Sequence, residues 1–225
     1  MARRYCLQRV LCKDSFAHMS DEQAAPARTV TLLDNAMALR AYAHPVRMKL
    51  ILALRTRGPL TATQAGRLLG ESSGTCSFHL RQLAKYGLVE ETGGGTGREK
   101  PWRATTTSTA WDDTPDDPEA AAAAGLLAEA LAESYFGQLM RWLEARPGQP
   151  EQWQRAAFLG DRVLWLTPEE LTRMGEELLA VTGRYFDRMV RPELRPPGSR
   201  LVTYLHLGFP NVTLPEETVT PHEEG

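Results

Sequence analysis

Residues 61–80, TATQAGRLLGESSGTCSFHL, contain a short helical pattern, a turn and the start of a second helix. Thr61 or Thr63 can cap the first helix, because threonine hydroxyls accept hydrogen bonds from the free N–H groups of a first turn. Gly70 ends this helix, since glycine readily adopts the left-handed conformation that closes many helices. The stretch therefore predicts two helices joined by a short turn around Gly70.

The second helix has two distinct faces and runs toward Gly87. Ser72 and Ser73 are natural N-caps. Apolar side chains recur at helical spacing on one face, namely Cys76, Leu80 and Leu83. The remaining faces are polar. A short helix, a turn and a capped helix with a polar outer face are typical of a helix-turn-helix.

The flanking residues extend this motif on both sides. Residues 45–57 predict a preceding helix, because proline suits the first helical position and Gly58-Pro59 ends the apolar pattern. Residues 88–92 and 101–105 predict two strands, and the glycine-rich stretch between them, GGGTGREK, predicts the tip of a hairpin. A hairpin directly after the second helix is a wing, so we predict a winged helix-turn-helix.

The order and spacing of these landmarks resemble the winged helix-turn-helix domain of bacterial ArsR-type transcriptional regulators. The matching residues are Leu39, His44-Pro45-Val46-Arg47, Gly58-Pro59-Leu60-Thr61, Ser77-Phe78-His79-Leu80, Leu83 and Gly87-Leu88-Val89. The resemblance covers roughly residues 34–106. It implies binding of double-stranded DNA by a homodimer that reads palindromic sites.

The charge of the chain is divided between its two halves. Residues 26–110 hold twelve Lys or Arg against five Asp or Glu, a surplus of seven positive charges. Residues 111–225 hold ten Lys or Arg against twenty Asp or Glu, a surplus of ten negative charges. Such asymmetry indicates a module that faces nucleic acid joined to an acidic partner domain, although a solvated basic surface gives the same count.

A helix that enters the DNA major groove needs small or polar side chains near its N-terminus, because bulk would block its approach to the base edges. Hydroxyl groups, arginine and glutamine can bond bases, and an aromatic ring can pack on a thymine methyl group. Lysines and arginines further along or on a wing contact phosphates. The residues expected to bind DNA are Ser73, Thr75, Ser77, Phe78, Arg81, Gln82 and Lys85 on the helix, and Arg98, Lys100 and Arg103 on the wing.

Two other functions of this half are less favoured. A winged helix can mediate protein contacts alone, which leaves a protein-interaction module as the alternative to DNA binding. Many ArsR-type proteins sense metals through thiol-rich sites in the short first helix, but residues 61–65, TATQA, contain no Cys, His, Asp or Glu. Cys76 lies on the apolar face and is expected to be a core residue. No metal site and no cofactor are predicted.

The acidic half predicts a helical domain over residues 119–212, after a polar linker over residues 109–118. Residues 119–146 and 151–166 carry helical apolar patterns, and Thr167 and Glu170 form a capping box for a further helix. Residues 201–210 predict a final strand. This half can supply the dimer interface, a pocket for a small organic effector, or both.

The remaining features complete the prediction. Residues 1–25 predict a disordered leader and residues 213–225 a disordered tail, and the winged helix-turn-helix domain is expected over residues 30–108. Neither a signal peptide nor a membrane span nor an enzyme motif is found, and three cysteines fit a cytoplasmic protein. We predict a mainly α fold with a small β-wing, and a sequence-specific DNA-binding regulator, most simply a homodimeric repressor.

Overall fold

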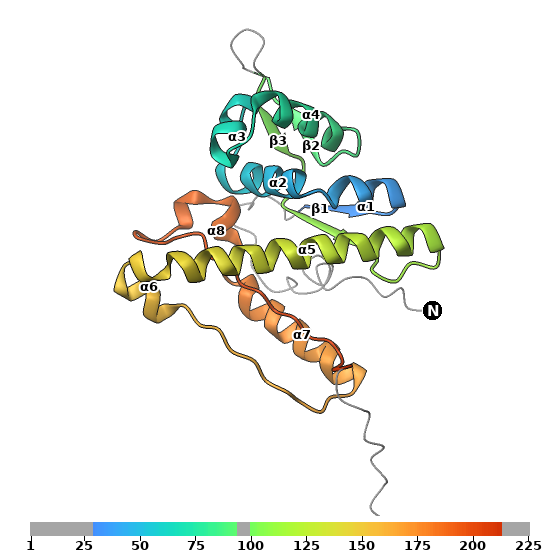
Figure 1. Cartoon of the computed structure of the whole chain (residues 1–225), viewed down its shortest axis with the longest axis vertical. Coiled ribbons are helices and arrows are strands. Elements are labelled where there is room, and N and C mark those ends of the chain that lie inside the picture. Colours follow the sequence, from blue (N-terminus) through green and yellow to red (C-terminus); the bar gives the residue numbers. More distant parts are fainter. Residues whose placement is uncertain (1–28, 94–99, 213–225) are drawn as a thin grey trace, which may run out of the picture.

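The helix-turn-helix and its wing occupy one end of the molecule in Figure 1, a computed structural model that describes residues 29–93 and 100–212. The predicted leader and tail therefore lie outside the described residues. The elements of this unit are α2 (Pro45–Arg57), α3 (Ala62–Leu69), α4 (Ser73–Ala84), β2 (Val89–Glu91) and β3 (Trp102–Ala104). This arrangement confirms the predicted fold class, which is mainly helical with a small β-wing.

The helix ends follow from local chemistry. The Thr61 hydroxyl accepts a hydrogen bond from the N–H of Gln64, whose side chain accepts from the Thr61 N–H in return, so Thr61 rather than Thr63 caps α3. Gly70 ends α3 with φ 71°. Ser72 rather than Ser73 caps α4, because its hydroxyl accepts from the N–H of Thr75 at 3.0 Å.

The wing is an antiparallel pair in which Val89 lies opposite Ala104 and Glu91 opposite Trp102. Leu60 forms an isolated bridge with Trp102, which ties the start of α3 to the wing. A continuous hydrophobic core joins α4 to α2 and to the wing. Its fully buried members on α2, α4 and the wing include Leu50, Ile51, Cys76, Leu80, Leu83 and Leu88.

A second, parallel sheet closes the base of this unit. β1 (Val30–Leu33) pairs with β4 (Ser108–Trp111), and α1 (Ala36–Tyr42) follows β1. Arg55 of α2 holds β4 in place, because its Nε donates to the Thr106 carbonyl at 3.0 Å and its guanidinium donates to the Thr109 hydroxyl at 2.8 Å. Residues 109–111, which the sequence assigns to a linker, form this buried strand instead because they pair with β1, about 80 residues away in the chain.

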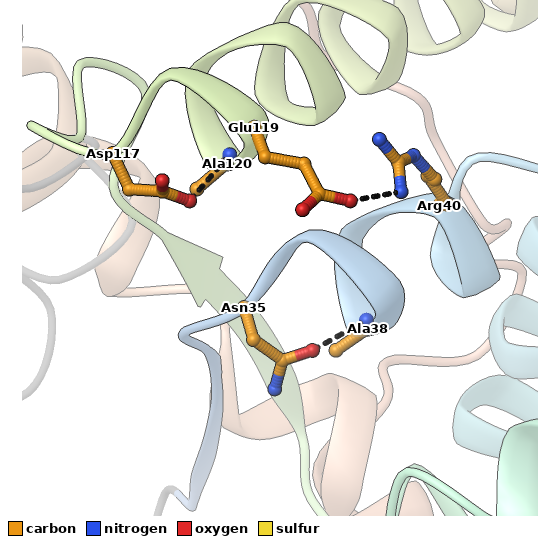
Figure 2. Close-up of polar contacts among 6 residues, drawn as sticks. All are labelled: Asn35, Ala38, Arg40, Asp117, Glu119 and Ala120. Atoms are coloured by element: carbon orange, nitrogen blue, oxygen red, sulfur yellow. Dashed lines mark hydrogen bonds and ion pairs between the residues drawn. The ribbon is translucent and has the colours of Figure 1, made fainter.

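The long helix α5 (Pro118–Ala145) lies beneath the helix-turn-helix unit and extends well past it (Figure 1). Its first turns pack on α1, and an ion pair between Arg40 and Glu119 at 2.7 Å joins the two helices (Figure 2). Asp117 caps α5 and Asn35 caps α1 at the same place. Leu127 belongs to the helix-turn-helix core and is fully buried. The helix predicted over residues 119–146 is thus one continuous helix that starts inside the N-terminal core.

The rest of the chain contains shorter elements. These are the 3-10 turn η2 (Arg146–Gly148), α6 (Glu151–Ala156), α7 (Pro168–Gly183), α8 (Asp187–Val190) and the 3-10 turn η3 (Pro192–Leu194). The predicted capping box of Thr167 and Glu170 begins α7. α8 packs against α2 of the helix-turn-helix unit.

Two predictions for this half are wrong. The helical pattern over residues 151–166 ends at Ala156, and residues 157–166 are extended, because Gly160 and Asp161 interrupt the helical sequence. Residues 201–210 are extended, but no strand is formed there because this stretch has no hydrogen-bonded strand partner within the described residues.

Candidate nucleic-acid interface

A groove runs between α3, α4 and the wing, and the outer face of α4 forms one wall. The side chains and backbone that line it belong to Ala62, Thr63, Ser73, Gly74, Ser77, Arg81, Glu91, Lys100 and Trp102. Four of these residues were predicted to bind DNA. Ser73, Ser77 and Arg81 are four residues apart on α4, so they lie in one row along the helix. The structure therefore brings Ser73, Ser77, Arg81 and Lys100 together at one surface.

The side chains of this row on α4 are small at Ser73 and Ser77 and charged at Arg81. Ser73 and Gly74 are exposed, and the nearest non-neighbouring atom to a Cβ added at Gly74 would be the Ser72 hydroxyl at 3.7 Å. Arg81 donates a hydrogen bond to the Ser77 hydroxyl at 2.6 Å. Since both side chains reach the surface, this pair can open when a stronger acceptor approaches. This row thus presents little bulk at the N-terminal end of α4 and one accessible guanidinium in its C-terminal half.

The other predicted residues on α4 fall into two groups. Phe78 and Lys85 are exposed, and Gln82 is half-buried beside them, so these three side chains continue the outer face away from the groove. Thr75 is half-buried, and its hydroxyl shares a hydrogen bond with the Ser72 hydroxyl at 2.8 Å. Thr75 therefore belongs to the cap of α4 and has less freedom to bond a base.

The wing cations already have acidic partners. Lys100 lies 3.0 Å from Glu91, and Arg103 lies 2.6 Å from Glu90. All four side chains are largely exposed, and exposed pairs of this kind contribute about 0–1 kcal/mol each. Phosphates can replace these carboxylates at small cost. Arg103 does not line the groove, and Arg98 lies outside the described residues.

The positive surplus of the N-terminal half is only partly available to a ligand. Arg55 is directed to Thr106 and Thr109, just before and within β4, and its burial lowers the pKa of its guanidinium. Arg40 pairs with Glu119, and Arg47 donates to the Arg40 carbonyl at 3.1 Å. These three arginines are engaged in contacts within the fold and do not line the groove. The charge that faces the groove is therefore smaller than the sequence count indicates.

The inner face of α4 is closed to solvent. Cys76 is fully buried in the core, and its burial raises the pKa of the thiol, so its predicted role as a core residue is confirmed. His79 is buried against His44, with ring centroids 4.4 Å apart. Burial lowers the pKa of both imidazoles. Among the residues that the structure describes, no group of three or more His, Cys, Asp or Glu could hold a metal ion.

Five residues of the groove were not predicted as site residues. Ala62 and Thr63 lie at the start of α3, Gly74 is the second residue of α4, Glu91 ends β2, and Trp102 begins β3. A signal for Thr63 was present, because once Thr61 caps the helix, Thr63 lies in its first turn. Nothing in the sequence places Trp102 beside α4, since that contact depends on the wing folding back.

The helix-turn-helix unit matches a known protein family. A family described as a helix-turn-helix domain matches residues 42–92, which span the end of α1, all of α2 to α4 and strand β2. No curated protein matches the chain. None of the helices within residues 29–93 and 100–212 is long and apolar enough to cross a membrane. This match supports a DNA-binding transcriptional regulator in general, and it does not favour the protein-interaction module.

Proposed function

We propose that this protein is a sequence-specific transcriptional regulator of the ArsR type that binds operator DNA as a cytoplasmic homodimer and represses transcription. One observation carries the proposal: Ser73, Gly74, Ser77 and Arg81 form an open, polar row along α4 at the groove beside the wing. Residues 61–65 contain no soft metal ligand, so the signal that such a regulator answers to is not a metal held at that position.

The row on α4 suits insertion into a major groove. The small residues Ser73 and Gly74 allow the helix to approach the base edges, and the Ser77 hydroxyl can bond a base or a phosphate. Arg81 exchanges its neutral hydrogen bond with Ser77 for a charged or bidentate one with guanine or phosphate, which is the stronger interaction. Base contacts along this row would supply specificity.

The wing and the end of α4 would supply register and affinity. Lys85 is exposed on α4, and Lys100 and Arg103 would exchange Glu91 and Glu90 for phosphates. The two glutamates are left near the DNA backbone when their partners move. Their negative charge limits non-specific affinity, and this makes the contacts of α4 a larger share of the binding free energy.

We assign DNA binding to the basic half of the chain and dimerisation to the acidic half. Residues 30–111 and the buried start of α5 form the DNA-binding unit, and the chain from there to residue 212 forms the dimerisation half. Two copies related by a two-fold axis place two α4 helices in successive major grooves, about 34 Å apart, and so read a palindrome. An organic effector would act on the dimerisation half, where Phe158, Tyr204 and His206 lie in one row of rings.

Binding of the full chain to DNA tests the proposal. We would measure fluorescence anisotropy with a labelled duplex from the region upstream of the protein's own gene, and with a shuffled duplex of equal composition. The upstream duplex should bind with a Kd of about 10 nM or lower and at least ~1,000-fold more tightly than the shuffled one. If a dimer neutralises four to six phosphates, the log–log salt slope should be roughly −4 to −5. Equal affinity for both duplexes at physiological salt would contradict the proposal.

A further inference from the structure

Two extended segments of the C-terminal half expose a large amount of apolar surface. Residues 157–166 join α6 to α7, and residues 200–212 run past α7 (Figure 1). Phe158 is 82% exposed, Trp165 81% and Phe209 76%. The aliphatic side chains that are more than half exposed on the same segments are Leu159, Val163, Leu164, Leu201, Val202, Leu207 and Val212.

Much of the backbone of these segments makes no hydrogen bond to other backbone in the described part of the chain. Within the described residues, no backbone-to-backbone hydrogen bond involves residues 159–166 or residues 200–210. Both stretches are rich in residues that favour strands, as in RVLWL and LVTYLHL. An extended apolar segment with free N–H and C=O groups has the properties of an unpaired edge strand, which readily pairs with another strand.

Together, the exposed aromatic and aliphatic side chains of the two segments present more apolar area than the largest patch of an ordinary monomer. A fully exposed aromatic side chain presents about 150–250 Å², so Phe158, Trp165 and Phe209 alone expose about 400–500 Å². The largest apolar patch of a typical monomer is about 300–600 Å². With the seven aliphatic side chains, the exposed apolar area reaches the ~800 Å² per partner that a stable interface buries.

The two segments belong to one surface. The rings of Phe158 and Tyr204 lie edge to face, with centroids 6.5 Å apart, and these residues come from the first and the second segment. The Thr203 hydroxyl is 3.2 Å from the Gln138 side-chain oxygen, and the Arg200 guanidinium donates to the Gln149 side chain. These contacts hold the second segment against the end of α5 and the turn that follows it. A partner that pairs with the first segment would therefore meet the second as well.

We propose that a second copy of this chain covers this surface, and that residues 159–166 pair antiparallel with the same residues of the other copy. The inference rests on the proposed function, since it locates the interface of the proposed dimer. A two-fold axis makes such pairing self-complementary, because each N–H that one copy donates to a C=O of the other is repeated by the equivalent N–H and C=O with the two copies exchanged. Residues 158–166 carry one Asp and one Arg, so two copies pair without net repulsion.

The alternation of side chains supports this occupant. In an extended chain Val163 and Trp165 project to one face, and Leu164 and Leu166 to the other. A two-fold axis perpendicular to an antiparallel pair keeps equivalent residues on the same face. Val163 and Trp165 of one copy would therefore pack beside Val163 and Trp165 of the other, and both faces of the pair would be apolar near its centre.

The test compares a substitution in the segment with a matched one elsewhere. Trp165→Lys places a charge in the proposed interface, and Met37→Lys makes the same change at a 63% exposed apolar side chain on α1. We would measure molar mass by light scattering after size exclusion at micromolar concentration. The wild type and Met37→Lys should have about twice the chain mass of 25.0 kDa, and Trp165→Lys should have the mass of one chain. Circular dichroism would verify that both variants are folded.

Hydrogen exchange gives a second readout that an apolar contact alone would not change. Alternate amides of residues 159–166, those directed at the other copy, should be protected in the wild-type dimer, and this protection should be lost on dilution and in Trp165→Lys. A dimer that survives Trp165→Lys with these amides unprotected would overturn the interface, although the proposed regulator could still bind DNA as a dimer. Protection that persists in a monomer would also overturn it, because the segment would then pair within one chain. Loss of DNA discrimination, by contrast, would defeat the proposed function and leave the mass result standing.

Discussion

The close approach of α3 and α4 at Gly66 yields a prediction about stability. A Cβ added at Gly66 would lie 2.7 Å from the Glu71 carbonyl oxygen and 3.4 Å from the backbone of Ser72 and Ser73. Carbon atoms ordinarily approach carbonyl oxygens to about 3.3 Å, so the turn would have to move by about 0.6 Å. The Glu71 N–H donates to the Gly66 carbonyl at 2.9 Å and Ser72 caps α4, so the turn cannot move without displacing α4.

The magnitude of this effect follows from two opposing contributions. Overpacking of this kind costs about 1–3 kcal/mol, whereas replacing glycine by alanine in a helix contributes about 1 kcal/mol of stability. Gly66→Ala should therefore lose about 0–2 kcal/mol. Gly125→Ala is the matched control, because Gly125 is exposed within α5 and no atom would lie within 4 Å of an added Cβ.

The assay is urea unfolding followed by circular dichroism. Gly125→Ala should be as stable as the wild type or up to about 1 kcal/mol more stable, and Gly66→Ala should be about 1–3 kcal/mol less stable than Gly125→Ala. Since one kcal/mol corresponds to about 2–4 °C in a chain of this size, the two melting temperatures should differ by several degrees. Equal stability of the two variants would refute the close packing of α3 on the turn.

Two further predictions concern the buried histidines and the start of α5. Burial lowers the pKa of His79 and of His44 below the ordinary value of 6.5, so the unfolded chain binds more protons than the folded one below that pH. The free energy of unfolding should therefore fall as the pH decreases from 7.5 to 5.5, and urea unfolding of His79→Gln should show a smaller fall; an equal fall in both proteins would contradict this. Leu127→Ala should cost about 2–5 kcal/mol, because Leu127 is fully buried in the helix-turn-helix core, whereas Leu126→Ala, at a side chain 55% exposed, should change stability by less than about 1 kcal/mol. Similar losses for the two leucines in urea unfolding would show that α5 does not pack on that core.

The parts of the fold that the sequence predicts depend on local chemistry. Thr61, Gly70 and Ser72 lie at helix ends, and their roles follow from which backbone groups need partners there. The apolar spacing of Cys76, Leu80 and Leu83 orients α4, and the polar row on its other side follows directly. The wing strands were also predicted, because the glycine-rich stretch lies between two short runs that favour strands.

The parts that the sequence does not predict depend on distant partners. β1 and β4 have four residues each, which is too short for a clear alternation, and they meet only when the whole helix-turn-helix lies between them. The ion pairs of Lys100 with Glu91 and Arg103 with Glu90 depend on the register of the wing. The charge count therefore overestimated the cations available to DNA.

The extended segments of the C-terminal half have the composition of strands but form none within one chain. RVLWL and LVTYLHL have strand-like composition, and the second was predicted to be a strand. Strand formation needs a partner, and the described residues of one chain provide none. The composition indicates that a segment is able to form a strand, but the strand forms only where the assembly provides a partner strand.

The central claim is that α4 reads DNA, and one comparison tests it most directly. We would measure the Kd of the upstream duplex and of the shuffled duplex for Arg81→Ala, with Arg173→Ala as the control because Arg173 is exposed on α7. If α4 reads the operator, Arg81→Ala should weaken binding to the upstream duplex by about 10- to 100-fold and reduce its preference over the shuffled one, while Arg173→Ala should stay within about twofold of the wild type. Unchanged affinity and preference in Arg81→Ala would contradict the claim.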